Sequence, residues 1–453
     1  MLKITVKDLI QKCNATLING NEYEIINECF VDSKKVKKGS CFFGIKGENI
    51  DGSSFYEEAF NNGASICVLN ERQNIDLNNF KDKTILFSKD VKKTLQKLAL
   101  YKRSLFKGTV IGITGSIGKT RTKERLSNIL EKKYKVLKTL GNENSQIGLP
   151  LTILRLKDEQ VMILEMGMSK KNEMHKLSLI AKPNISVITN VLDSHIGNLG
   201  SRKNILKAKL EIMDGMNNGT LIINNDNDLL NKYKNKLKDK INLITYGIDN
   251  KSDINAINIK EGINTYFDIE KIKDIKIFGG KTFIYNALAT YAISKILNIE
   301  DDIIIQSINN YSNIKHRLEV ISLKNNITII DDCYNASYDS VKAALKLLSM
   351  YKRRKIAILA DILEIGKDSK SIHNKIGNVV FENKIDILIT IGNDSKEIGV
   401  KAKELGMKKE NIKHFENLNI AKKYVKNNII SGDVVLIKGS NGMNLISLVE
   451  YLK

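Results

Sequence analysis

The sequence contains only two prolines and no tryptophan among its 453 residues. Proline therefore does not mark its linkers, and boundaries must be inferred from the alternation of apolar and polar segments. Its five cysteines form no C-x-x-C pair and no metal-site spacing, which excludes a disulfide-stapled or zinc-ribbon protein and suits a reducing compartment. No segment approaches the roughly 18 uncharged apolar residues of a membrane-spanning helix, and residues 1–12 carry no signal-peptide core. We therefore expect a cytoplasmic protein without membrane insertion.

Arginine and aromatic side chains are scarce, although the net charge is +21. Only nine of the 72 basic residues are arginine, and the lysines are spread from end to end. Aromatic residues make up 6% and do not interleave with basic runs, as the stacking platforms of nucleic-acid binders do. We therefore expect no nucleic-acid partner. A nucleic-acid-dependent P-loop ATPase would need a basic stripe that the sequence lacks, whereas a small polyanionic substrate is compatible with the charge.

The composition is that of an ordinary folded protein, with 42% apolar and 27% charged residues. The length predicts about three domains, which we place at residues 1–100, 101–315 and 316–453. From residue 109 onward, short β-rich runs alternate with helical stretches, which predicts an α/β fold with a parallel central sheet and a smaller, Rossmann-like C-terminal domain. The predicted central strands are Thr109–Thr114, Val161–Glu165, Ile185–Val191, Thr220–Asn224 and Ile241–Tyr246.

A glycine-rich turn follows the first of these strands. Its residues Gly115, Ser116, Ile117, Gly118, Lys119 and Thr120 lead directly into a predicted helix. Two glycines let backbone N–H groups surround an anion, the helix N-terminus favours negative charge, the lysine reaches outer phosphates, and the threonine hydroxyl suits Mg²⁺. The spacing is G-x-x-G-K-T rather than the longer P-loop form. A chance glycine turn before a helix is the alternative interpretation.

Two further side chains follow neighbouring strands. Glu165 ends the apolar run 161–165, and His195 lies just beyond the strand that starts at Ile185. Ligands of open α/β sheets bind at the carboxyl ends of the strands, so both side chains should meet the glycine turn there. With Thr120 they could bind Mg²⁺. Taken singly, each residue could equally be a capped strand end or a loop histidine.

Lys209 occupies an unusual place on the predicted helix 203–213. Ile205, Ala208, Ile212 and Met213 form one apolar face, and Lys209 falls inside it. A lysine at such a position can extend its amine to water. Alternatively, the amine is desolvated, loses its proton more readily and becomes reactive.

These motifs, together with others in the same order, resemble the Mur ligases, the ATP-dependent amide-forming enzymes of peptidoglycan precursor synthesis. The resemblance covers nearly the whole chain and is nearest to the type that joins D-alanyl-D-alanine to UDP-MurNAc-tripeptide. The segments that carry it are 32–36, 41–52, 112–124, 141–152, 165–167, 188–201, 208–211, 285–289, 316–318, 330–336, 361–366 and 438–443.

The resemblance implies ATP, Mg²⁺, UDP-MurNAc-tripeptide and D-alanyl-D-alanine as ligands of a three-domain enzyme, which we expect to be a monomer. It implies catalytic roles for Lys119, Glu165, His195 and a carbamylated Lys209, with Mg²⁺ held by Thr120, Glu165, His195 and Lys209. It assigns ATP binding to Gly115, Ser116, Gly118, Lys119, Thr120, Asn286, Arg317 and Asp332. Substrate binding falls to Asp32, Ser33, Lys46, Asp51, Gly52, Asn142, Tyr334, Asn335 and Ser440, of which the first five lie in the predicted uridine-nucleotide domain.

The chain departs from the family pattern at several positions. It has Thr282 and Phe283 where the family usually has His-Asn, and Arg121 where a small hydroxyl residue is usual. Ser53 and Asn441 stand where this type tends to carry histidine and arginine. Two alternatives stay open at this point, namely a diverged paralogue that joins another amino acid or peptide, and a degenerate nucleotide-binding partner without activity.

Overall fold

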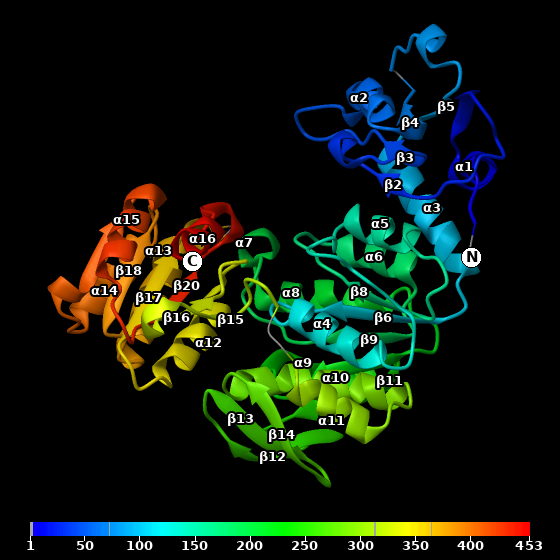
Figure 1. Cartoon of the computed structure of the whole chain (residues 1–453). Helices are drawn as coiled ribbons and strands as arrows, with labels where there is room; N and C mark the ends of the chain where they lie inside the picture. Colours follow the sequence, from blue (N-terminus) through cyan, green and yellow to red (C-terminus); the bar gives the residue numbers. More distant parts are fainter. Residues whose placement is uncertain (1–2, 72, 312–313, 364) are drawn as a thin grey trace.

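The computed structural model describes residues 3–71, 73–311, 314–363 and 365–453. Within these residues, three β-sheets follow one another along the chain (Figure 1). The N-terminal sheet (blue) stands above the central sheet (cyan to green), and the C-terminal sheet (yellow to red) lies beside the central one. Of the segment 361–366 used in the resemblance, Glu364 lies outside the described residues. None of the described helices has the length and apolar content needed to cross a membrane.

The N-terminal sheet has five strands in the order β1-β5-β4-β3-β2, with only β1 antiparallel to its neighbour. Its elements are α1 (Val6–Cys13), β1 (Thr16–Asn19), β2 (Cys29–Phe30), β3 (Ser40–Phe43), α2 (Tyr56–Asn61), β4 (Ala64–Asn70), β5 (Thr84–Ser88) and α3 (Val91–Leu105).

Helix α3 fastens this domain to the central one. Asp90 caps it by accepting a hydrogen bond from the backbone N–H of Lys93 (2.9 Å). Near its C-terminus, Lys102 Nζ donates to the carbonyl of Leu154 (2.7 Å) and Arg103 Nε donates to the carbonyl of Ala181 (2.6 Å). Both cations are buried and pair with backbone oxygens of the central domain. The predicted domain break near residue 100 falls inside this helix.

The central sheet has nine strands in the order β14-β13-β12-β11-β10-β9-β6-β8-β7. They are β6 (Thr109–Thr114), β7 (Val136–Lys138), β8 (Val161–Glu165), β9 (Ile185–Ile188), β10 (Thr220–Asn224), β11 (Asn242–Gly247), β12 (Ile254–Lys260), β13 (Asn264–Ile269) and β14 (Ile272–Phe278). The helices are α4 (Lys119–Leu130), α5 (Gly148–Leu154), α6 (Glu173–Ala181), α7 (Ile196–Leu199), α8 (Arg202–Leu210), α9 (Asp228–Lys238), α10 (Ile284–Ile296) and α11 (Asp301–Asn309).

The C-terminal sheet has six strands in the order β15-β16-β20-β17-β18-β19, and only β15 runs antiparallel. Its elements are β15 (Glu319–Ser322), β16 (Thr328–Asp331), α12 (Tyr338–Ser349), β17 (Lys355–Ala360), α13 (Ser369–Glu382), β18 (Ile387–Ile391), α14 (Lys396–Glu404), β19 (Ile412–Phe415), α15 (Leu418–Asn428), β20 (Val434–Lys438) and α16 (Ile446–Leu452).

The predicted fold class is confirmed: the chain has three α/β domains, each with its own sheet, and the central sheet is parallel from β7 to β12. Strands β6, β8 and β10 have the predicted bounds because each is a short apolar run that is buried on both faces. Strands β12 to β14, which pair antiparallel with one another, were not predicted. In β12 the register shifts between Ile257 and Lys260, which breaks the period-two pattern that would reveal a strand.

Candidate active site

Most of the predicted site residues line one cleft of about 550 Å³ between the central and C-terminal domains. From the central domain come Gly115, Ser116, Gly118, Lys119, Thr120, Asn142, Glu165, His195, Lys209 and Asn286. From the C-terminal domain and the segment leading to it come Arg317, Asp332, Tyr334, Asn335 and Ser440. The glycine turn and the buried lysine, which are widely separated in the sequence, therefore face the same space.

The glycine turn is held in a shape that only glycine can adopt at two points. Gly115 has φ +150°, and a Cβ there would lie 1.8 Å from Thr189 Oγ1. Gly118 has φ +86°, and a Cβ there would lie 2.5 Å from Asn286 Nδ2. Asn190, just after β9, accepts hydrogen bonds from the backbone N–H groups of Ser116 (3.1 Å) and Ile117 (3.0 Å) through Oδ1. The turn thus presents backbone donors to a single acceptor, as a phosphate-binding loop does.

Lys119 is the first residue of α4, and its ammonium folds back over the turn. Nζ donates to the carbonyls of Gly115 (2.7 Å) and Ser116 (3.4 Å). Burial lowers the pKa of Lys119, the nearby Glu165 carboxylate acts in the opposite direction, and Arg317 adds to the lowering. The side chain therefore places a cation at the mouth of the turn, and no carboxylate of residues 3–71, 73–311, 314–363 or 365–453 forms an ion pair with it.

A carboxylate at the end of β8 meets this turn. The side chain of Glu165 is buried, with Oε2 accepting from Thr120 Oγ1 (2.9 Å) and Oε1 accepting from Asn144 Nδ2 (2.9 Å). The ammonium of Lys123 lies 3.8 Å from the same Oε2 and donates to the carbonyl of Thr139 (2.6 Å). A buried carboxylate is costly unless it is paired and hydrogen-bonded. These contacts satisfy it while its oxygens stay on the cleft wall.

Lys209 lies in α8 with only 2% of its surface exposed. Burial, together with repulsion from Lys119, moves the pKa of Lys209 well below the usual range of a lysine. Among the described residues, no hydrogen bond or ion pair engages its Nζ. The amine does not extend into bulk water, so the desolvated arrangement is the one adopted. His195 lines the same cleft and starts α7 with φ +63°.

Further polar residues line the cleft: Asn286 lies on the same side as the glycine turn, whereas Arg317 and Asp332 lie across from it. Asn286 Nδ2 donates to Thr122 Oγ1 (3.1 Å), beside the glycine turn. The Arg317 guanidinium lies 3.9 Å from the ring centroid of Tyr334. Asp332 accepts from the backbone N–H of Leu318 (3.1 Å) and pairs with Lys438 Nζ (2.6 Å).

Sequence reasoning did not single out several residues that hold this site. Lys438, Asn144 and Lys123 contact predicted site residues directly, and Thr189 and Asn190 hold the glycine turn. Lys438 and Asn144 lie inside segments used in the resemblance. Lys123 lies inside the segment 112–124 of the same resemblance, so the contacts of all three residues could have been sought there.

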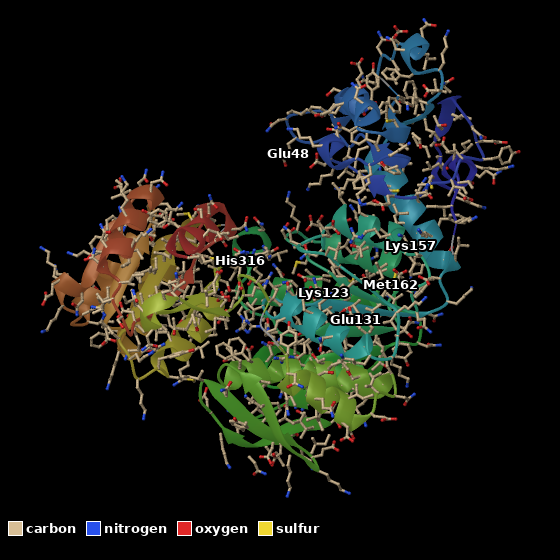
Figure 2. All side chains as sticks on the ribbon, in the orientation of Figure 1. Glu48, Lys123, Glu131, Lys157, Met162 and His316 are labelled. Carbon is tan, nitrogen blue, oxygen red and sulfur yellow. The ribbon has the colours of Figure 1, made fainter. Side chains whose placement is uncertain are left out.

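The five predicted uridine-nucleotide residues lie elsewhere, in the N-terminal domain. Asp32 caps the 3-10 turn Ser33–Lys35, and Ser33 Oγ donates to Glu58 (2.5 Å). The backbones of Lys46 and Asp51 form an isolated antiparallel β-bridge. A Cβ on Gly52 would lie 2.4 Å from the carbonyl oxygen of Ile45. None of the five lines the cleft. Figure 2 labels Glu48, in the same loop, on the side of this domain that faces the C-terminal domain.

Ser53, one of the departures from the family pattern, is part of the framework of this loop. Its side chain is fully buried, and Oγ donates to the carbonyl of Gly44 (2.9 Å) and accepts from the backbone N–H of Asn70 (2.9 Å). It therefore joins the end of β3 to the end of β4. Asn441 instead reaches the cleft, where Nδ2 donates to the carbonyl of Tyr334 (3.2 Å).

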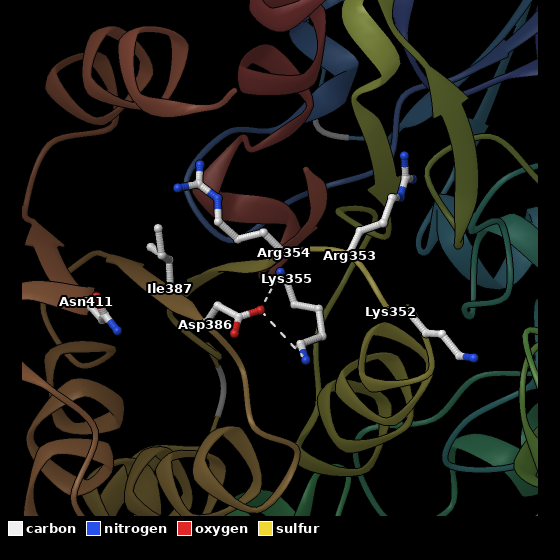
Figure 3. Close-up of a pocket in the computed structure, with 7 residues that line it drawn as sticks. All are labelled: Lys352, Arg353, Arg354, Lys355, Asp386, Ile387 and Asn411. Carbon is white, nitrogen blue, oxygen red and sulfur yellow. Dashed lines mark hydrogen bonds and ion pairs between the residues drawn. The ribbon is translucent and has the colours of Figure 1, made fainter. Parts of the chain in front are cut away.

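A second hollow, of about 390 Å³, lies at the opposite edge of the C-terminal sheet (Figure 3). Lys352, Arg353, Arg354 and Lys355 surround it beside Asp386. Arg354 pairs with Asp433 through two hydrogen bonds of 2.7 Å, and Lys355 lies 3.7 Å from Asp386. These residues lie where β17 and β18 begin, whereas ligands of parallel sheets bind where strands end. We assign no function to this hollow.

Comparison with known proteins covers the whole chain. Three family models match: "Mur ligase family, catalytic domain" over residues 26–103, "Mur ligase middle domain" over 113–294, and "Mur ligase, glutamate ligase domain" over 316–441. A relative from Bacillus subtilis, UDP-N-acetylmuramoyl-tripeptide--D-alanyl-D-alanine ligase, is 36% identical over 100% of this chain and 99% of its own length.

Solved structures give the same picture. MurF from Acinetobacter baumannii superposes with a TM-score of 0.89 at 25% identity, covering 99% of this chain and 98% of that one. MurF from Thermotoga maritima in complex with ADP superposes with a TM-score of 0.80 at 27% identity, covering 94% of this chain and 97% of that one.

Proposed function

The chain belongs to the Mur ligase family, and from this premise we propose that it joins D-alanyl-D-alanine to UDP-N-acetylmuramoyl-tripeptide with ATP. This reaction is a step of peptidoglycan precursor synthesis. The observation that carries the proposal is the match over the whole chain to the Bacillus subtilis ligase of that name. The similar proteins reported above point to this reaction, so no observation favours the diverged paralogue considered from the sequence.

The chemistry begins with activation of an acid. An oxygen of the tripeptide carboxylate attacks the γ-phosphorus of ATP, the bond to the β-phosphate oxygen breaks, and ADP leaves with the electron pair. The amine of D-alanyl-D-alanine then attacks the acyl carbon and loses a proton. The tetrahedral intermediate collapses by expelling phosphate, which leaves the amide.

The first step brings two anions together, and one like-charge pair at 4 Å costs about 4 kcal/mol at an effective dielectric of 20. In our proposal Lys119 opposes this repulsion, because its ammonium lies over the glycine turn where outer phosphates would bind. Arg317 adds a second cation from the far wall of the same cleft. Closure of the C-terminal domain would exclude water, which protects the acyl phosphate from hydrolysis.

The donor set of the cleft fits Mg²⁺, which prefers oxygen ligands. Thr120 Oγ1 and Glu165 Oε2 lie 2.9 Å apart on the buried wall, and His195 lines the same cleft. These three residues, with a carbamylated Lys209, would hold the ion. When bound, Mg²⁺ supplies positive charge to the phosphate oxygens.

Carbamylation of Lys209 rests on the state of its amine. A neutral amine can capture CO₂, and burial favours the neutral form of this lysine. The new N–C bond gives a carbamic acid, which loses one proton to become a carboxylate. This negative charge attracts Lys119, whereas a protonated Lys209 would be repelled by it. No ion pair with a described residue holds the Nζ of Lys209, and this supports the proposal because a lysine held in an ion pair would stay protonated.

The remaining ligands are assigned by domain. We propose that Asn286, Arg317 and Asp332 hold the nucleotide, that Asn142 faces the acid, and that Tyr334, Asn335 and Ser440 face the incoming amine. Asp32, Ser33, Lys46, Asp51 and Gly52 would hold the uridine nucleotide on the N-terminal domain. A cytoplasmic location and a monomeric state stay predictions.

Mass spectrometry of the product tests the proposed reaction. The protein is incubated with UDP-MurNAc-tripeptide, ATP and D-alanyl-D-alanine, and in parallel with single amino acids and other dipeptides. We expect the pentapeptide product only with D-alanyl-D-alanine, together with equimolar ADP and phosphate. Product with a different amine, and none with D-alanyl-D-alanine, would overturn the proposed substrate.

A further inference from the structure

Two departures from the family pattern touch each other in the structure. The guanidinium carbon of Arg121 lies 4.4 Å from the ring centroid of Phe283, which is a cation–π contact. Arg121 is the third residue of α4, directly after Lys119 and Thr120, and Phe283 immediately precedes α10. Phe283 is buried, so its ring offers a fixed, desolvated face to the guanidinium.

The same guanidinium crosses to the segment between the central and C-terminal domains. Arg121 Nη2 donates to the carbonyl oxygen of Arg317 (3.3 Å). Asp332 attracts the charge of Arg121, and the charge of Arg317 repels it. One face of Arg121 is thus occupied by Phe283, and its edge is directed at the peptide of Arg317.

The backbone around Arg317 is held in an unusual form. His316 has φ +61° and Leu318 has φ +56°, a conformation that a bulky residue adopts only when its surroundings impose it. The C-terminal domain supplies two of the constraints: Tyr334 N–H donates to the His316 carbonyl (3.1 Å), and Leu318 N–H donates to Asp332 (3.1 Å). Arg121 supplies a contact from the central domain. Figure 2 shows His316 beside the C-terminal sheet, on its side toward α4, which carries the label Lys123.

We propose that Arg121 and Phe283 form a positioning pair that holds the Arg317 peptide against the phosphate loop and thereby sets the affinity for ATP. Phe283 fixes the plane of Arg121, Arg121 fixes the carbonyl of Arg317, and the Arg317 side chain is left to meet the nucleotide over Tyr334. The inference rests on the proposed function, in which Arg317 meets phosphate.

Arg121 and Phe283 act as a unit because the contact between them is lost when either side chain is replaced. A threonine at position 121, the type of residue usual in the family, is too short to reach either the ring or the Arg317 carbonyl. An asparagine at position 283 would offer no aromatic face. Two independent substitutions would therefore each remove the same contact, which is the property that a double-mutant cycle detects.

Binding of ADP and of a non-hydrolysable ATP analogue, measured by calorimetry without acid or amine, tests this proposal. We expect Arg121→Thr and Phe283→Asn each to raise Kd by roughly 2- to 30-fold, the range between an exposed and a desolvated cation–π contact. The Kd of the double variant should be no higher than that of the single variant with the higher Kd. Arg121→Lys, which keeps the charge but loses the planar fork, should fall between wild type and Arg121→Thr. In steady-state assays, KM for ATP should rise while kcat changes by less than about twofold.

The matched control is Lys426→Thr, which removes a cation–π contact with Tyr451 (4.8 Å) away from the cleft and should leave Kd unchanged. Losses that add in the double variant, or an unchanged Kd in either single variant, would overturn the proposal. If thermal unfolding shows that Arg121→Thr is not folded, Arg121→Lys and Phe283→Asn provide the same test. The binding experiment contains no amine. Failure of this proposal can therefore be distinguished from an error in the amine substrate of the proposed function, because the wild type should bind nucleotide in either case.

Discussion

The Thr120 hydroxyl donates a hydrogen bond to the Glu165 carboxylate across 2.9 Å, joining the first turn of α4 to the end of β8. Two residues from different strand–helix units thus place their oxygens side by side on the wall of the cleft. Because α4 and β8 both belong to the central domain, this pair of oxygens is preorganised before any ligand arrives.

Replacing Glu165 by glutamine removes the charge and keeps the shape. We expect phosphate release in the complete reaction to fall at least about 100-fold, with a higher Mg²⁺ requirement in whatever activity remains. The matched control is Glu131→Gln, on an exposed carboxylate just beyond α4 that lies near Lys138 (3.9 Å) and outside the cleft. Wild-type rates in Glu165→Gln at all Mg²⁺ concentrations would contradict the assignment.

Removing the Lys209 side chain should abolish activity, and a small carboxylic acid should restore part of it. We expect Lys209→Ala to release no phosphate, because the metal loses one ligand, and we expect added acetate or formate to restore part of the rate. The carbamate itself should appear as a bicarbonate-dependent signal in carbon-13 NMR of the wild type. Absence of that signal, together with full activity of Lys209→Ala, would refute carbamylation.

The burial of Lys209 also has a consequence for stability. Its folded-state pKa is lowered, so in CO₂-free, metal-free buffer the unfolded state binds more protons than the folded state, and the free energy of unfolding rises with pH toward the unfolded pKa near 10.5. We expect Lys209→Met to be more stable than wild type at pH 7 and this advantage to shrink as the pH approaches 10. Urea unfolding at several pH values measures it. A constant difference across that range would contradict the lowered pKa.

The glycine turn offers a pair of substitutions with matched backbone strain. Gly118 has φ +86° and Gly432 has φ +89°, so alanine is strained at both. Only at position 118 does the added Cβ meet a side chain, since Asn286 Nδ2 would lie 2.5 Å away, whereas nothing lies within 4 Å at position 432.

We therefore expect both alanine variants to lose about 1 kcal/mol of unfolding free energy, but only Gly118→Ala to bind ADP more weakly, by about tenfold or more. Calorimetry and urea unfolding separate the two effects. Equal losses of ADP affinity in the two variants would show that strain, and not the contact with Asn286, governs binding.

Local sequence segments carry the resemblance to the Mur ligases. The fold class could be predicted from that resemblance and from the pattern of short apolar strands. Strands β6 and β8 could be predicted because a short apolar run bounded by a turn leaves few alternatives. Strands β12 to β14 could not, because their faces are mixed and their register is irregular. Ser53 could be predicted only in part. The motif placed it in the loop, but its two buried hydrogen bonds could not be predicted from the sequence.

The amino-acid order alone predicted the glycine turn and the acid at the end of β8, because both depend on neighbours within a few positions and on the rule that parallel strands end at one edge. Tertiary structure decided which charges are desolvated and which are paired. Lys209 is buried with no ion-pair partner in the part of the chain that the structure describes, whereas Lys438 is buried against Asp332, which lies 106 positions away. The reason is physical: the charge state of an amine depends on everything that packs around it, and that environment exists only once the chain has folded.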